Sequence, residues 1–197
     1  MKSVELLQTS LIEGVGEAGC DEAGRGCLAG PVVAAAVVLP DGFTHPLLRD
    51  SKTLSESRRR EARDIILANA VDWSVAEVNA EEIDHINILK ASILAMHRAL
   101  DGLTNKPGHV SVDGNRFTAW RDVNFTTVVK GDGKLANIAA ASILAKVHRD
   151  ELMEKLHKAM PVYGWGENKG YPTRLHREAI AKYGPSAWHR MSFTLVK

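Results

Sequence analysis

The sequence has few of the features that mark secreted, membrane or redox proteins. Cys20 and Cys27 are the only cysteines among its 197 residues. Their spacing fits neither a CxxC motif nor a disulfide framework, and so few cysteines suit a reducing cytosol. The longest apolar run, residues 32–39, is too short to cross a bilayer. Acidic residues interrupt the first thirteen positions, so no signal peptide is predicted. We therefore expect a cytoplasmic protein without membrane attachment.

Aromatic residues and net charge are also scarce. Aromatics make up 6% of the chain, too few for an extended base-stacking platform, and the net charge is +1. The charges are unevenly distributed, however: residues 1–50 hold 3 Lys/Arg against 7 Asp/Glu, and residues 130–197 hold 12 against 6. This distribution is expected if a cation site and a phosphate-binding surface come from opposite ends of the chain, and equally if the charges lie on solvated helix faces.

Local patterns predict strands mixed with helices. With no repeat, low-complexity tract or linker in 197 residues, one domain spanning residues 1–197 is expected. The apolar run 32–39 lies between Pro31 and Pro40 and predicts a strand covered on both faces. Further strands are expected at residues 72–78, 110–113 and 125–129. Helices are expected over residues 53–70, 79–100 (with one possible break), 137–158 and 173–184. The fold class is therefore α/β.

Three of these helices have recognisable start signals. Thr53 with Glu56 predicts a capping box for the first helix, in which Ile65, Ile66 and Leu67 face inward. Asn79 with Glu82 predicts a second box. Thr173 predicts the cap of the last helix, which Gly184 and Pro185 end.

Acidic residues stand at the ends of the expected strands. They are Asp21, Glu22, Asp113 and Asp132. Carboxylates grouped near a core are costly unless cations neutralise them. Hard oxygen ligands without a Cys or His cluster favour Mg²⁺ or Mn²⁺, and two such ions can support phosphodiester cleavage. Taken singly, each acid could instead be a turn residue or helix cap, as Asp113–Gly114 and Asp132–Gly133 illustrate.

The surrounding segments resemble bacterial ribonuclease HII in type and in order. The first is residues 20–31, Cys-Asp-Glu-Ala-Gly-Arg-Gly-Cys-Leu-Ala-Gly-Pro. The others are residues 50–52, 112–114, 130–132, 139–146, 169–173 and 189–193. The resemblance spans residues 14–193. Two positions depart from the usual family pattern, Cys20 and Cys27, and both are expected to be inert buried thiols.

The resemblance implies an RNase H-like fold: a mixed central β-sheet flanked by helices, with a small C-terminal helical extension over about residues 160–197. It also implies roles for individual residues. The four acids would bind two divalent ions, Mn²⁺ or Mg²⁺. Gly24, Arg25 and Gly26 would grip the backbone at the ribonucleotide and recognise its 2′-hydroxyl, and Tyr171 would pack on the sugar at the RNA–DNA junction. Phosphate contacts are expected from Lys52, Arg190 and Ser192, with Lys146 and Lys169 as further candidates.

The implied activity is endonucleolytic hydrolysis of RNA in RNA–DNA hybrids and incision 5′ of single ribonucleotides in duplex DNA, leaving 3′-hydroxyl and 5′-phosphate ends. A ribonuclease HIII-like enzyme and a non-catalytic hybrid-binding module are the alternatives. Residues 14–19 spell GxGxxG, but the glycines that follow leave no room for the helix of a dinucleotide site. A monomer is expected. Residues 192–197 lack the paired aromatics of a clamp-binding motif.

Overall fold

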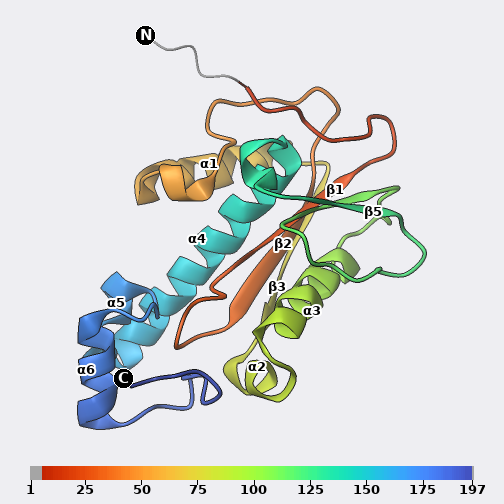
Figure 1. Cartoon of the computed structure of the whole chain (residues 1–197). Coiled ribbons are helices and arrows are strands. Elements are labelled where there is room, and N and C mark those ends of the chain that lie inside the picture. Colours follow the sequence, from red (N-terminus) through yellow and green to blue (C-terminus); the bar gives the residue numbers. More distant parts are fainter. Residues whose placement is uncertain (1–5, 197) are drawn as a thin grey trace.

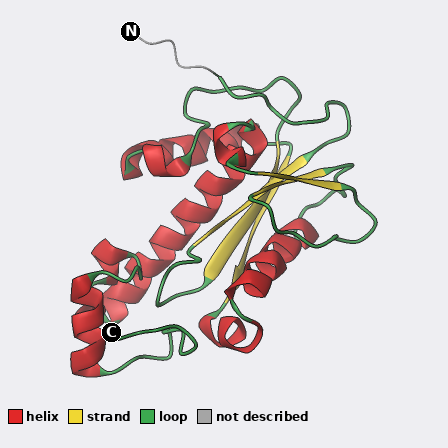
Figure 2. Ribbon diagram, viewed as in Figure 1, coloured by secondary structure: helices red, strands yellow, loops and turns green. Residues whose placement is uncertain are grey.

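The computed structural model describes residues 6–196 and has a five-stranded mixed sheet at its centre (Figures 1 and 2). The strand order is β3-β2-β1-β4-β5. The strands are β1 (Ala18–Ala23), β2 (Val32–Val38), β3 (Asp72–Val78), β4 (Val110–Asp113) and β5 (Phe125–Val128). Strands β1, β2 and β3 pair antiparallel, whereas β4 pairs parallel to both β1 and β5. The mixed sheet expected from the sequence is confirmed.

Helices cover both faces of this sheet (Figure 1). The α-helices are α1 (Glu56–Asn69), α2 (Ala80–Ile86), α3 (Ile88–Asp101), α4 (Ala136–Ala159), α5 (Trp165–Asn168) and α6 (Arg174–Tyr183). Short 3₁₀ helices are η1 (Ser51–Thr53), η2 (Gly131–Gly133) and η3 (Pro161–Tyr163). Helices α4 and α1 pack on one face, and α3 packs on the other. Figure 2 shows α4 running the length of the molecule to the C-terminal helices.

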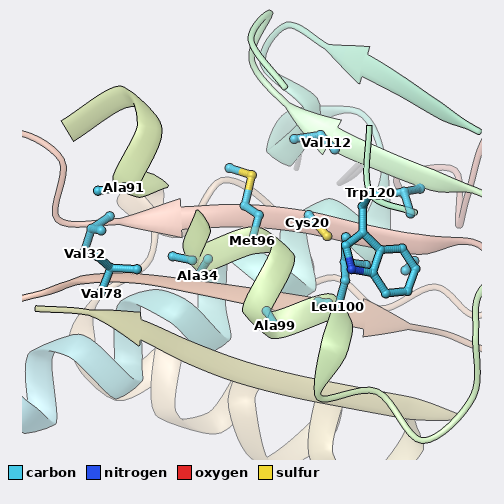
Figure 3. Close-up of a cluster of buried hydrophobic side chains, with 14 of the residues drawn as sticks. Cys20, Val32, Ala34, Val78, Ala91, Met96, Ala99, Leu100, Val112 and Trp120 are labelled. Atoms are coloured by element: carbon cyan, nitrogen blue, oxygen red, sulfur yellow. The ribbon is translucent and has the colours of Figure 1, made fainter. Parts of the chain in front are cut away.

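Strand β2 is buried on both faces, as its apolar run predicts. Successive side chains of a strand point to opposite faces. Accordingly, Ala34 belongs to the cluster beneath α3, and its neighbour Ala35 belongs to the cluster beneath α4. Figure 3 shows the first cluster, in which Met96 and Leu100 of α3 lie over the sheet. The small alanines of β2 let both helical layers approach the sheet closely.

The start of α1 differs from the prediction. Ser55, not Thr53, is the N-cap, and its hydroxyl accepts a hydrogen bond from the backbone N–H of Arg58. Thr53 lies in η1, whose cap is Asp50. Of the three residues expected to face inward, Ile66 is buried, Ile65 is half-buried and Leu67 is exposed. The prediction for Leu67 was wrong because a helix turn of 3.6 residues cannot place three consecutive side chains on one face.

The second helical region is broken once, between α2 and α3. Asn87 lies at the break with a left-handed φ of 68°, and its side chain accepts hydrogen bonds from the backbone N–H groups of Leu89 and Lys90. The capping box of Asn79 and Glu82 is confirmed. Asn tolerates positive φ better than most residues, which explains why the chain turns here.

The C-terminal helices form a third apolar cluster with the last turns of α4, which contribute Met153 and Leu156. Thr173 caps α6 through the backbone N–H of His176, and Gly184 ends that helix, as predicted. None of the helices in residues 6–196 is long and apolar enough to span a membrane. Two predictions fall partly outside the described residues. The expected lack of a signal peptide concerns residues 1–13, of which 1–5 are not described, and the lack of a clamp-binding motif concerns residues 192–197, of which 197 is not described.

Candidate metal centre and nucleic-acid cleft

The sheet brings acidic residues from distant parts of the chain to one edge. Strands β1 and β4 are parallel neighbours, with Cys20 opposite Val112, so the next residues are Asp21 and Asp113. Glu22 follows on β1. Asp132 lies in η2, the turn between β5 and α4. All four acids of the sequence prediction therefore lie around the ends of two adjacent strands.

Asp21 is the most enclosed of these acids. It is 6% exposed and faces α4, where Ser142 lies beside it and lowers its pKa. Ser142 is in turn 3.0 Å, oxygen to oxygen, from the hydroxyl of Ser51. Burial raises the pKa of Asp21 well above its usual value, and the negative charges of Glu22 and Asp113 raise it further. The negative charge of Asp21 is thus costly in the absence of a cation.

The other acids are held by partners from the protein. Glu22 pairs with Arg25 at 3.1 Å, and Asp132 lies 3.8 Å from the Nζ of Lys52. Burial raises the pKa of Glu22, an effect that Arg25 opposes. Burial also raises the pKa of Asp132, with further contributions from the charges of Asp113 and Asp50. Neutralisation by Arg25 and Lys52 is therefore only partial.

The donor set fits a hard divalent cation in its chemistry. Within residues 6–196, no three His, Cys, Asp or Glu side chains converge as a ready metal cage. The carboxylates are nevertheless adjacent, partly buried and electrostatically strained, and they offer only oxygen ligands. Such ligands suit Mg²⁺ or Mn²⁺ rather than zinc. A bound cation would take over the roles that Arg25 and Lys52 have beside Glu22 and Asp132.

A cleft of about 260 Å³ joins three of these acids, Asp21, Glu22 and Asp113, to the residues expected to recognise the substrate. Asp132 reaches it through Lys52, which lines the cleft. Its lining residues include Asp21, Glu22, Gly24, Arg25, Gly26, Lys52, Asp113, Lys146 and Tyr171. The Gly24–Arg25–Gly26 segment follows β1 directly, and Gly24 has a left-handed φ of 94°. Glycine adopts this conformation without strain, which lets the chain turn sharply after Ala23.

Tyr171 also lines the cleft. Tyr171 is 41% exposed to solvent. The Nζ of Lys146 lies 5.7 Å and the guanidinium carbon of Arg149 lies 6.0 Å from the centre of its ring. The carbonyl of Tyr171 also bonds the ring nitrogen Nδ1 of His176 at 2.9 Å. The ring is therefore presented to the cleft by a backbone that is itself anchored.

Three candidates for phosphate contacts lie elsewhere. Arg190 is fully buried, and its guanidinium donates to the carbonyls of Gly30 and Arg25. The hydroxyl of Ser192 donates to Asp84 at 2.6 Å. Lys169 donates to Glu154 and to the carbonyl of Gly166. These side chains do not line the cleft that contains Lys52 and Lys146.

Sequence reasoning missed two residues that support Asp21. Ser51 and Ser142 are buried beside that carboxylate and hydrogen-bond each other. Both lie in segments that carry the family resemblance, residues 50–52 and 139–146, but serine in a sequence gives no signal of a buried hydroxyl pair. Cys20 and Cys27 are buried free thiols, and burial raises the pKa of both, as expected of inert cysteines.

Comparison with known proteins identifies the family. The sequence model described as Ribonuclease HII matches residues 18–196. The chain belongs to the ribonuclease HII family. Ribonuclease HII of Bacteroides fragilis is 59% identical over 180 residues, which cover 91% of this chain and 90% of that one. The family consists of metal-dependent endoribonucleases that act on RNA–DNA hybrids. This protein is therefore an endoribonuclease of that kind.

Solved structures agree with the RNase H-like fold. Ribonuclease H2 from Pyrococcus horikoshii has a TM-score of 0.75 at 28% identity and covers 91% of this chain and 94% of its own. The structure of the PCNA:RNase HII complex from Archaeoglobus fulgidus has a TM-score of 0.74 at 29% identity, with coverages of 92% and 96%. Membership of the ribonuclease HII family excludes the two alternative functions considered from the sequence, a ribonuclease HIII-like enzyme and a non-catalytic hybrid-binding module. A dinucleotide-binding site at the GxGxxG pattern of residues 14–19 is also excluded, because this pattern leads into strand β1 and not into a helix.

Proposed function

We propose that this enzyme incises duplex DNA on the 5′ side of single embedded ribonucleotides, in addition to cleaving hybrids, through two divalent ions. The observation that carries the proposal is the shared cleft, which combines Asp21, Glu22 and Asp113 with Gly24–Arg25–Gly26 and Tyr171. The acids are suited to binding the ions, and the glycine segment and Tyr171 are suited to recognising a ribose next to a deoxyribose.

Asp21, Glu22, Asp113 and Asp132 would hold the ions. When bound, Mg²⁺ or Mn²⁺ activates a water molecule and stabilises the leaving oxygen of the phosphodiester. Ser142 and Ser51 orient the carboxylate of Asp21. Lys52 and Arg25 neutralise neighbouring acids in the free enzyme and are free to contact phosphate once cations replace them.

Recognition would come from Tyr171 and the glycine segment. The backbone of Gly24, Arg25 and Gly26 can approach a sugar closely because glycine has no side chain to obstruct it. Tyr171 would place its ring on the sugar at the junction. Lys146 lines the cleft and can bind phosphate. Arg190 and Ser192 would act by supporting the loop and the C-terminal segment, in keeping with their buried or paired side chains.

The remaining proposals concern assembly. We propose one catalytic domain over residues 1–197, with about residues 160–197 as its helical extension, and a monomer in solution. We also propose that residues 192–197 do not dock on a sliding clamp, although the Archaeoglobus enzyme was solved in complex with PCNA. Either Mn²⁺ or Mg²⁺ would serve as cofactor.

The decisive experiment uses duplex DNA with one ribonucleotide, incubated with and without each divalent ion. Incision directly 5′ of the ribonucleotide, dependent on the ion, is expected. Cleavage confined to continuous hybrids would refute the junction activity, and full activity in excess chelator would refute the two-ion mechanism.

A further inference from the structure

Arg149 of α4 is a buried cation with an unusual set of partners. Arg149 is completely buried, with 0% of its surface exposed. The guanidinium donates three hydrogen bonds to backbone carbonyls: Nε to Pro31 at 3.1 Å, Nη1 to Lys169 at 2.8 Å and Nη2 to Ala29 at 3.0 Å. Across the described part of the chain, it forms no ion pair with a carboxylate. A buried charge is costly, so three aligned carbonyls must compensate for its lost hydration.

These carbonyls belong to the two segments that carry the proposed recognition elements. Ala29 and Pro31 end the loop that begins with Gly24, and Lys169 lies two residues before Tyr171. The two segments also touch directly, because the backbone N–H of Leu28 donates to the carbonyl of Gly170 at 2.8 Å. One guanidinium thus ties together two walls of the cleft that are far apart in sequence.

The glycines of both segments pack against the same side chain. A Cβ atom added at Gly24 would lie 2.1 Å from the Nε of Arg149. Cβ atoms at Gly30 and Gly170 would lie 3.5 Å and 3.3 Å from its Nη2. At Gly24 the guanidinium itself leaves no room for a side chain, whereas at Gly30 and Gly170 the added Cβ would first meet the sulfur of Met153 at 2.4 Å and the carbonyl oxygen of Ala29 at 2.6 Å. Arg149 therefore lies where the loop that begins with Gly24 meets the segment that carries Tyr171.

We propose that Arg149 is a positioning residue that sets the spacing between Gly24–Arg25–Gly26 and Tyr171, and so the preference for an RNA–DNA junction. This inference rests on the proposed junction activity. Lysine cannot replace the planar fork of arginine, because its single nitrogen cannot reach three carbonyls in fixed directions. Arg149 does not touch the acids, so its loss should affect substrate preference more than metal binding.

The test compares Arg149→Lys with the matched variant Arg177→Lys. Arg177 also donates to two backbone carbonyls, those of Thr194 and Leu195, but these belong to a segment that does not line the cleft. For each protein, kcat/KM is measured on DNA with one ribonucleotide and on a continuous hybrid, beside a melting curve with and without Mn²⁺. We expect Arg149→Lys to lose at least about tenfold more activity on the single ribonucleotide than on the hybrid, with an unchanged Mn²⁺-dependent rise in Tm. Arg177→Lys should keep the wild-type ratio.

A second variant separates positioning from folding. Arg149→Ala leaves space for a small cation, so added ethylguanidinium at concentrations that do not unfold the protein should restore incision at the junction, and ethylammonium should not. Equal losses on both substrates, no rescue, or the absence of a cooperative melting transition in both variants would each overturn the inference. Failure of the proposed function is a different outcome, since the wild-type enzyme would then not incise at a single ribonucleotide at all.

Discussion

The carboxylate of Asp113 accepts a hydrogen bond of 2.7 Å from the backbone N–H of Gly131. This contact ties the end of β4 to η2, the turn that carries Asp132. Lys130, just before the turn, has a left-handed φ of 56°. Two acids from separate segments are therefore fixed near each other by backbone geometry, before any cation binds.

Asp113→Asn should abolish most cleavage without unfolding the protein. The amide oxygen can still accept from Gly131, so the turn keeps its anchor, but the negative charge that attracts a cation is lost. We expect activity to fall by at least about a hundredfold, the usual cost of losing one electrostatic group at a reaction centre. Steady-state rates and circular dichroism check this. Near-wild-type cleavage would show that Asp113 is not a metal ligand.

Asp21→Asn should raise the Tm of the metal-free protein. Removing the charge relieves repulsion in a buried site, and about 1 kcal/mol shifts the Tm of a domain of this size by roughly 2–4 °C. The wild-type protein should gain stability from Mn²⁺ by mass action, whereas the variant should gain less. Melting curves in chelator and in excess Mn²⁺ measure both effects. A lower Tm for the variant in chelator would contradict the repulsion.

The products should carry 3′-hydroxyl and 5′-phosphate ends. A metal-activated water is the expected nucleophile, so the 2′-hydroxyl serves only in recognition. Mass spectrometry of the cleaved strands identifies the ends directly. Detection of a 2′,3′-cyclic phosphate would instead mean that the 2′-hydroxyl attacks.

Tyr171→Phe should retain substantial activity, because packing on a sugar needs the flat ring more than the hydroxyl. Tyr171→Ala should lose several-fold more activity on a single embedded ribonucleotide than on a continuous hybrid. The backbone of Tyr171 stays anchored by His176 in both variants, so neither should lower the Tm greatly. Equal losses on both substrates together with a large drop in Tm would assign Tyr171 a purely structural role.

The C-terminal helices should lose stability in mild acid. His189 and His176 are buried, with their Nε2 atoms 3.2 Å apart. The N–H of Trp165 donates to the Nε2 of His176 at 3.0 Å, which requires that nitrogen to be unprotonated. Burial, together with the neighbouring His176, lowers the pKa of His189 from 6.5 to about 4. Because the unfolded chain takes up the proton more readily, this stabilisation is complete above pH 6.5 and declines as the pH falls towards about 4.

When His189 is fully protonated, the free energy of unfolding should be lower by an amount on the order of 3 kcal/mol. Chemical unfolding of the wild-type protein and of His189→Gln between pH 4 and pH 7 measures it. The variant should be less stable at neutral pH but less dependent on pH below about 6.5. Parallel pH profiles for the two proteins would contradict the prediction.

The family and much of the local structure could be predicted from the sequence. The family segments, the apolar run of β2, the Asn79 capping box and the Thr173 cap were predictable because each depends on a few neighbouring residues. The start of α1 at Ser55 was not, since Thr53 and Ser55 are both good caps and packing decided between them.

The surroundings of the basic residues, in contrast, emerge only from the folded chain. Arg190 looks like a phosphate ligand in the sequence, yet it is buried against carbonyls of the Gly24–Pro31 loop. Arg149 looks like an ordinary helix residue, yet its guanidinium donates to the carbonyls of Pro31 and Lys169. Burial and hydrogen-bond partners depend on segments more than a hundred residues away, and no local pattern encodes which carbonyls will surround a guanidinium after the chain has folded.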